Sequence, residues 1–230
     1  MSARAVIFDM DGLLLDSERA ILDCWRATAA AQSLVLDDSL WLSMVGLHEA
    51  GCAALLEKRL GAEATTRLTQ SCHEEYDRRV EGGLPLKAGA RALLQELFDL
   101  GVPMAVATST RGERARLKLA RSGLDGYFRH VVTSSDVVHA KPAPDLYLLA
   151  AQRLGIPPGQ CMALEDSEFG VCAASAAGIK VIQVPDLLPA TDLTRQLAHV
   201  APSLTQARPL VDAFLGFGQA HESQAAVSAT

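Results

Sequence analysis

The sequence predicts an α/β protein with a doubly wound parallel sheet and an all-helical segment inserted after the first strand. Short apolar runs, several of them rich in β-branched residues, alternate along most of the chain with segments of helical periodicity. Acidic or hydroxyl side chains follow several of these runs at the point where the run ends. The interval 17–81 breaks the alternation, because it has helical periodicity and no convincing strand.

The predicted strands are the five apolar runs at 5–8, 102–108, 130–133, 161–164 and 181–184. Helical patterns separate them at 89–100, 111–122, 145–154 and 168–177. Strands that alternate with helices form a parallel sheet covered on both faces, which here predicts a Rossmann-like core. Gly155 and Gly178 follow two of these helices, where a left-handed C-cap favours glycine. Ser167 precedes the last helix, where its hydroxyl can act as an N-cap.

The helical insert is predicted over residues 16–82, between the two parts of a core made of residues 1–15 and 83–217. Its helical patterns cover 18–31, 38–45, 48–60 and 62–80. The exit combines two glycines with a proline at 82–85, which is a strong break in regular structure. Residues 218–230 are small and polar, and we expect them to form a loose tail.

Composition limits the classes of function. A chain of 230 residues can bury one sizeable core with a modest insert. The net charge of −6 argues against a broad nucleic-acid surface, so any anion site must be built locally. The five cysteines show no CxxC or zinc spacing, as in a cytoplasmic protein with reduced thiols. No apolar stretch approaches the length of a membrane span. We therefore expect a cytoplasmic protein that binds neither nucleic acid nor membrane.

The strongest signal is the segment that starts at Asp9 and ends at Glu18. Asp9 and Asp11 stand two residues apart directly after a buried strand, where their like charges repel each other. A divalent cation relieves this repulsion, and the carboxyl edge of a parallel sheet is where ligands bind. Gly12 allows the backbone to turn sharply without a Cβ. The alternative is a strand followed by an ordinary Asp-Gly turn.

Three further segments place polar groups at or beyond the ends of predicted strands. Residues 108–110 are three hydroxyl residues that offer neutral donors, although such a turn also caps helices. Lys141 stands before two prolines that restrict the backbone, although a lone Lys is by default a solvated loop residue. Glu165 and Asp166 follow the fourth strand. The alternative to a functional role is that acids here only stabilise the N-terminus of the next helix through its dipole, which applies above all to Glu168.

Together these segments resemble the haloacid dehalogenase superfamily. Asp-x-Asp-Gly-x-Leu-x-Asp-Ser-Glu at residues 9–18 is similar to its first motif, in the branch with a helical cap inserted after the first strand. That branch includes sugar-phosphate phosphatases, phosphoglycolate phosphatase and β-phosphoglucomutase. The other three segments follow in the order of the family, so the resemblance spans residues 4 to about 205. It implies a Mg²⁺-dependent phosphatase, expected to be a monomer, that acts on a small phosphorylated metabolite.

The resemblance also assigns roles to residues. Asp9 would be the nucleophile and Asp11 the general acid/base. Mg²⁺ would be held by Asp9, by the main-chain oxygen of Asp11, by Asp166, and by Glu165 either directly or through water. An all-oxygen set of this kind suits Mg²⁺ rather than zinc. Thr108 and Lys141 would contact the transferred phosphoryl group. The further expected substrate contacts are Met10, Gly12, Ser109, Thr110, Arg111 and Glu18, with the N–H groups of residues 10–12 and of Ser109 as phosphate donors.

Other functions are compatible with parts of this pattern. A phosphomutase resembling β-phosphoglucomutase needs a cationic contact from the cap, and the family's Arg in the loop 45–49 aligns with Glu49; Arg111 could still bind a distal phosphate. A dehalogenase is disfavoured because its relatives lack the second acid of the first motif. A phosphonate hydrolase needs a Lys near the start of the cap, and residues 16–57 contain none. An inactive binding module is disfavoured by the intact set of motif residues. The identity of the substrate stays open.

Overall fold

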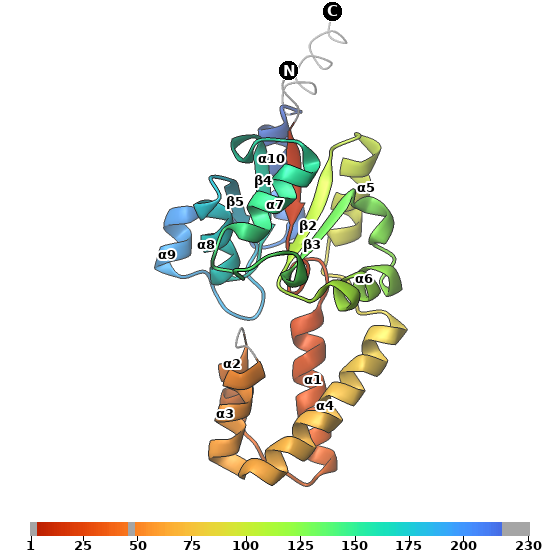
Figure 1. Cartoon of the computed structure of the whole chain (residues 1–230), viewed down its shortest axis with the longest axis vertical. Helices are drawn as coiled ribbons and strands as arrows, with labels where there is room; N and C mark the ends of the chain where they lie inside the picture. Colours follow the sequence, from red (N-terminus) through yellow and green to blue (C-terminus); the bar gives the residue numbers. More distant parts are fainter. Residues whose placement is uncertain (1–3, 46–48, 218–230) are drawn as a thin grey trace, which may run out of the picture.

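The computed structural model describes residues 4–45 and 49–217, and the α/β prediction is confirmed. One six-stranded sheet has the order β3-β2-β1-β4-β5-β6, with every neighbouring pair parallel (Figure 1). Its strands are β1 (Ala5–Phe8), β2 (Met104–Thr108), β3 (His130–Thr133), β4 (Cys161–Glu165), β5 (Lys180–Gln183) and β6 (His199–Val200). Because β1 lies between β2 and β4, the carboxyl ends of these three strands meet at one edge of the sheet.

Helices cover both faces of the sheet, and alternate residues of β1 supply the two cores. Ala5 and Ile7 pack in a cluster with α7 and α8, whereas Val6 and Phe8 pack in another with α5, α6 and α10. This alternation follows from the two-residue period of a strand. The helices that follow the insert are α5 (Ala90–Asp99), α6 (Gly112–Arg121), α7 (Asp145–Leu154), α8 (Glu168–Ala176), α9 (Asp192–Leu197) and α10 (Leu204–Leu215).

The insert forms a helical lobe beyond the carboxyl edge of the sheet, below the sheet in Figure 1. Its helices are α1 (Ser17–Ala31), α2 (Asp38–Met44), α3 (Glu49–Leu60) and α4 (Ala62–Gly82). The two long helices, α1 and α4, pack side by side, and α4 also contacts α6 of the core. The connections into and out of the lobe run together, since the Asp16 N–H donates to Pro85 at 2.8 Å and the Lys87 N–H donates to Leu14 at 2.9 Å. Of the described residues between 17 and 81, none lies in a strand.

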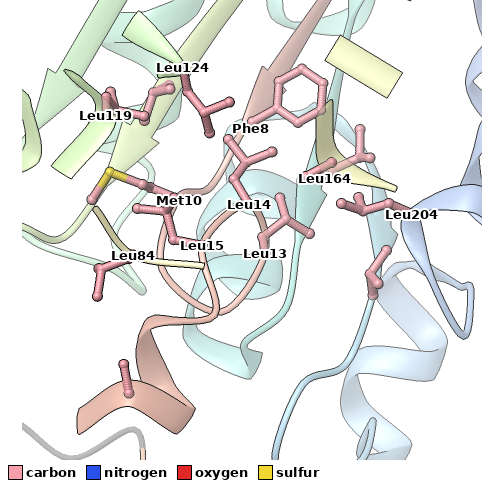
Figure 2. Packing of buried hydrophobic residues seen from close by; sticks show 14 of the residues in the cluster. Phe8, Met10, Leu13, Leu14, Leu15, Leu84, Leu119, Leu124, Leu164 and Leu204 are labelled. Atoms are coloured by element: carbon pink, nitrogen blue, oxygen red, sulfur yellow. The ribbon is translucent and has the colours of Figure 1, made fainter. Parts of the chain in front are cut away.

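The loop after β1 is anchored by its apolar residues. Met10, Leu13, Leu14 and Leu15 are fully buried. They pack beneath the end of β1 against side chains from distant segments, which are Leu84, Leu119, Leu124, Leu164 and Leu204 (Figure 2). This packing holds the loop backbone on a rigid base, so the acidic residues at positions 9 and 11 have a defined place at the edge of the sheet.

Most predicted elements are confirmed, and the differences have physical reasons. Strand β2 begins at Met104 rather than at residue 102, because Pro103 has no N–H to donate to a neighbouring strand. The predictions missed β6, which has two residues, and α9; they assigned no range to α10, whose Pro209 argues against a helix interior. The tail at 218–230 and the loop residues 46–48 lie outside the described residues. None of the described helices has both the length and the apolar character to cross a bilayer.

The predicted helix caps are present in the structure. The Ser167 hydroxyl accepts a hydrogen bond from the N–H of Gly170 at 3.1 Å, which closes the first turn of α8. Gly155 ends α7 in the left-handed conformation, and Gly178 after α8 has a φ of +75°. The sequence was sufficient to predict these caps, because each cap depends on one residue and the adjacent helical turn.

Candidate active site

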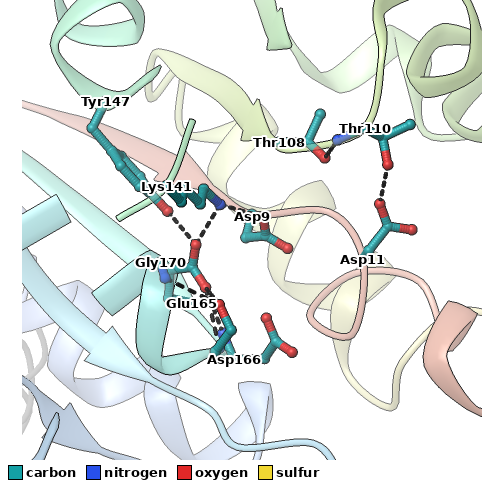
Figure 3. Close-up of polar contacts among 10 residues, drawn as sticks. Asp9, Asp11, Thr108, Thr110, Lys141, Tyr147, Glu165, Asp166 and Gly170 are labelled. Atoms are coloured by element: carbon teal, nitrogen blue, oxygen red, sulfur yellow. Dashed lines mark hydrogen bonds and ion pairs between the residues drawn. The ribbon is translucent and has the colours of Figure 1, made fainter. Parts of the chain in front are cut away.

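A cluster of three carboxylates and one lysine lies where β1 and β4 end (Figure 3). The Lys141 amine contacts the Asp9 carboxylate at 2.6 Å and the Glu165 carboxylate at 2.5 Å. One carboxylate oxygen from each of Asp9, Glu165 and Asp166 lies within 4.8 Å of the others. The motifs that the sequence places at separate strand ends therefore come together in one site.

The cluster carries more negative charge than Lys141 can balance. Burial raises the pKa of Asp9 to about 8, against the lowering effect of Lys141 and with a further upward effect of Glu165. Burial and the neighbouring Asp9 raise the pKa of Asp166 well above its ordinary value. Although burial opposes it, the pKa of Lys141 is raised by Asp9 and Glu165. A divalent cation fits this set of oxygen donors, because its charge would stabilise the ionised carboxylates.

The Glu165 side chain is saturated by contacts within the protein. One of its oxygens accepts from Lys141 and, at 2.7 Å, from the Tyr147 hydroxyl. The other accepts from the N–H groups of Asp166 and Ser167 and from the Ser167 hydroxyl. A Cβ on Gly170 would overlap this carboxylate, so the glycine makes room for it. This arrangement favours Asp9 and Asp166 over Glu165 as direct metal ligands. Glu165 instead fixes the position of the Lys141 amine.

Asp11 is held separately, by contacts from two other elements. The Lys118 amine of α6 lies 2.7 Å from one carboxylate oxygen of Asp11, and the Thr110 hydroxyl donates to the other at 2.6 Å. Thr108 in turn accepts from the N–H of Thr110 at 3.1 Å, which leaves its own hydroxyl proton to donate elsewhere. Burial alone would raise the pKa of Asp11, but Lys118 and the hydrogen bonds lower it. Asp11 therefore rests as a carboxylate.

Lys118 was missed by the sequence-based reasoning. It lies on the buried stripe of α6 with Ala115 and Leu119, and only 5% of the residue is exposed. A lysine on the apolar face of an amphipathic helix is a detectable signal, because a charge is seldom buried there without a partner. The sequence does not identify that partner, since Asp11 is 107 residues away.

The remaining predicted residues surround these two clusters. Ser109 and Arg111 are exposed at the turn into α6, and Met10 is buried in the loop. Burial and the nearby Asp11 raise the pKa of Glu18, at the start of α1, to about 7. The Gly12 N–H donates to the Leu15 carbonyl at 2.9 Å. The expectation that this N–H contacts a phosphoryl oxygen is therefore not supported, because it is engaged within the loop.

Gly12 is expected to be intolerant of a side chain. Its φ is +81°, and a Cβ would overlap the Asp166 carboxylate. Gly12→Ala should therefore destabilise the fold by about 1–3 kcal/mol and displace Asp166, so that turnover falls. Urea denaturation and steady-state kinetics measure the two effects. Gly101→Ala is the matched control, because Gly101 has a φ of +69° with nothing within 4 Å of a built Cβ. Equal turnover in both variants would contradict the expectation that Gly12 must lack a side chain for Asp166 to keep its place.

Comparisons with known proteins show what this sequence and fold are similar to. The model of a hydrolase family, the haloacid dehalogenase-like hydrolases, matches residues 3–178. The phosphorylated carbohydrates phosphatase of Thermotoga maritima is 34% identical over 179 residues, which cover 77% of this chain and 83% of the relative. The fructose-1-phosphate phosphatase YqaB of Escherichia coli is 34% identical over 188 residues, with coverages of 78% and 95%. A solved structure of a HAD family hydrolase from Deinococcus radiodurans, with bound phosphate and sodium, superposes on this chain with a TM-score of 0.76. The two sequences are 27% identical, and the superposition covers 93% of this chain and 97% of the Deinococcus chain.

Proposed function

Because the chain belongs to the haloacid dehalogenase-like hydrolase family, we propose that it is a Mg²⁺-dependent phosphatase of a small phosphorylated metabolite such as a sugar phosphate. The reaction would pass through an aspartyl-phosphate on Asp9. The observation that carries the proposal is the pairing of Asp9 with Lys141 next to Asp166, while Asp11 is held as a second, separate carboxylate.

Mg²⁺ would be held by Asp9, Asp166 and the main-chain oxygen of Asp11. When bound, it supplies positive charge that stabilises the phosphoryl oxygens as negative charge develops. The support for this assignment is the excess of carboxylates around a single Lys141 and the raised pKa values of Asp9 and Asp166.

Asp9 is the nucleophile in this proposal. A carboxylate oxygen of Asp9 attacks phosphorus, the bond from phosphorus to the ester oxygen breaks, and the phosphoryl group remains on Asp9. Lys141 favours the ionised form of Asp9 through their 2.6 Å contact and adds positive charge beside the incoming group. The Thr108 hydroxyl and the Met10 N–H would donate hydrogen bonds to the phosphoryl oxygens as the bonds form and break.

Asp11 handles the protons. With substrate bound, the negative charge of the phosphate beside Asp11 would favour its protonated form. The acid then gives its proton to the leaving ester oxygen, and the resulting carboxylate takes a proton from the water that attacks the aspartyl-phosphate, which restores the acid. The second step releases inorganic phosphate and restores Asp9. Asp11 lies two residues beyond Asp9 on a loop whose apolar side chains are fully buried, so the nucleophile and the acid/base share one rigid support.

Residues 16–82 would form the cap over a catalytic core of residues 1–15 and 83–217. The lobe lies beyond the edge of the sheet at which the acidic cluster is placed (Figure 1). Closure of a cap excludes water and adds specificity contacts. Glu18 at the start of α1 would accept a hydrogen bond from a substrate hydroxyl. Ser109 and Arg111 at the start of α6 are exposed and free to contact a larger leaving group.

Phosphate release from a panel of phosphorylated metabolites, measured with Mg²⁺ and with EDTA, tests the function. We expect release with Mg²⁺ and loss of release with EDTA, because the carboxylates repel one another and the phosphate without a cation. Mg²⁺ should also raise the melting temperature, since a ligand that binds the folded state stabilises it. Asp166→Asn is the control, and it should lose most of this thermal shift.

Two results would contradict the proposal. Phosphate release that continues unchanged in EDTA would show that the reaction does not need a divalent cation. No release from any compound by a folded, Mg²⁺-stabilised protein would favour the phosphomutase, and after it the binding module.

A further inference from the structure

We propose that Lys118 is a positioning residue for Asp11 and that, through Tyr76, it couples the general acid/base to the helical insert. This inference rests on the proposed function of Asp11. It is carried by one chain of contacts between three segments: the loop after β1, helix α6 of the core and helix α4 of the insert. The contacts bring Asp11, Lys118 and Tyr76 together across the boundary between the core and the insert.

Lys118 occupies a place where a lysine has a specific task. Its side chain is 6% exposed, and its amine lies 2.7 Å from Asp11. A buried ammonium without a partner is strongly unfavourable, so the ion pair with Asp11 is a condition for this packing. Thr110 holds the other oxygen of Asp11. With one donor on each oxygen, rotation of the carboxylate is restricted on both sides.

Tyr76 brings the insert into the same contact network. Tyr76 is 7% exposed on α4, and its ring centroid lies 5.3 Å from the Lys118 amine, a cation–π contact. A displacement of α4 relative to α6 therefore changes the surroundings of Lys118 directly. The described structure thus contains a direct route by which the position of the insert can affect the orientation of Asp11.

Other contacts between α4 and α6 do not reach Asp11. Arg114 pairs with Asp77 at 2.6 Å and lies over the Tyr76 ring at 5.3 Å. Arg121 pairs with Glu81 at 2.7 Å. These ion pairs are partly exposed, so each contributes little to stability. Arg114 is therefore a suitable control residue: it touches the same tyrosine and the same helix pair, but it is not a partner of Asp11.

The variants Lys118→Met, Lys118→Arg and Tyr76→Phe test the inference together with the control Arg114→Met. Misplacement of an acid/base costs rate rather than affinity, so Lys118→Met should lower kcat by about 10- to 100-fold. KM should stay within about threefold, because substrate binding is not removed. Lys118→Arg keeps the charge and should recover part of the lost rate. Tyr76→Phe should give a smaller loss, since the ring over the Lys118 amine remains and only the hydroxyl is removed.

The dependence on the leaving group separates positioning from a general structural role. p-Nitrophenyl phosphate has a leaving group that departs without a proton, whereas a sugar phosphate needs one. Lys118→Met should therefore reduce kcat/KM, which reports the steps up to formation of the aspartyl-phosphate, more for the sugar phosphate than for p-nitrophenyl phosphate. Arg114→Met should leave the ratio of the two kcat/KM values unchanged. Equal losses on both substrates would overturn the inference.

The failure of this inference differs from the failure of the proposed function. An active wild-type enzyme whose Lys118→Met variant keeps full kcat on the sugar phosphate would overturn only the role of Lys118. A wild-type protein that releases no phosphate contradicts the proposed function instead. In that case a crystal structure of Lys118→Met still tests whether Lys118 positions Asp11. A displaced Asp11 carboxylate would support the inference, and an unmoved one would overturn it.

Discussion

Replacement of Asp9 by Asn is expected to reduce phosphate release by about 10⁴-fold or more, as for the loss of a covalent nucleophile. The amide has nearly the shape of the carboxylate, but its oxygen is a poor nucleophile, so the aspartyl-phosphate cannot form. The loss should appear in kcat for every substrate, including p-nitrophenyl phosphate, because the first chemical step is removed whatever the leaving group is.

Steady-state kinetics and acid-quench trapping measure this effect. Wild-type protein quenched during turnover with a labelled substrate should carry phosphate that alkali releases, and Asp9→Asn should carry none.

The variant should remain folded, because Lys141 keeps its contact with Glu165 at 2.5 Å. Burial raises the pKa of Asp9 to about 8, above its value in the unfolded chain, so the buried acid lowers the stability of the metal-free fold near neutral pH, where the unfolded chain carries it ionised. In EDTA, Asp9→Asn should therefore melt at the same temperature as the wild type or higher. If Asp9→Asn remained active, Asp9 would not be the nucleophile, and another residue would have to act in its place.

Replacement of Asp11 by Asn is expected to lower kcat/KM for a sugar phosphate by about 10²- to 10⁴-fold, the range for general acid/base catalysis. An alkoxide is a poor leaving group without a proton, and the amide cannot supply one. The reduction should be much smaller for the first step with p-nitrophenyl phosphate, because a nitrophenolate departs unprotonated.

A burst experiment separates the two roles of Asp11. With p-nitrophenyl phosphate, Asp11→Asn should release a fast equivalent of nitrophenol and then turn over slowly, because hydrolysis of the aspartyl-phosphate still needs a base. The phosphorylated enzyme should accumulate in an acid quench. Equal reductions for both substrates with no burst would show that Asp11 acts mainly in holding the loop or the metal.

Local patterns in the sequence were sufficient for the fold class and for the motif residues. The apolar runs that became β1, β2 and β4 are short and bounded by acids, hydroxyl residues or proline, so their ends could be predicted closely. In a parallel sheet these ends share one edge, which is why residues as distant as Asp9 and Asp166 were expected to meet. The helical insert was visible because a 3.6-residue period needs no knowledge of its partners.

Elements with weak local signals were not predictable. Strand β6 has two residues and exists only because β5 offers an edge. Helix α10 contains Pro209, and its apolar residues Leu204, Ala207 and Val211 join the cluster on one face of the sheet. Tertiary packing outweighs the local preference in both cases.

The order of residues along the chain is enough to identify the reactive groups: a pair of acids at one strand end, a lysine, and acids at a second strand end. Which of these groups contact one another depends on how the chain folds. The fold places Tyr147 and Lys141 on Glu165, so that this acid supports the lysine, and it places Lys118 on Asp11. The physical reason is that these partners come from different elements, so their pairing depends on how the helices pack against the sheet and not on the spacing of residues along the chain.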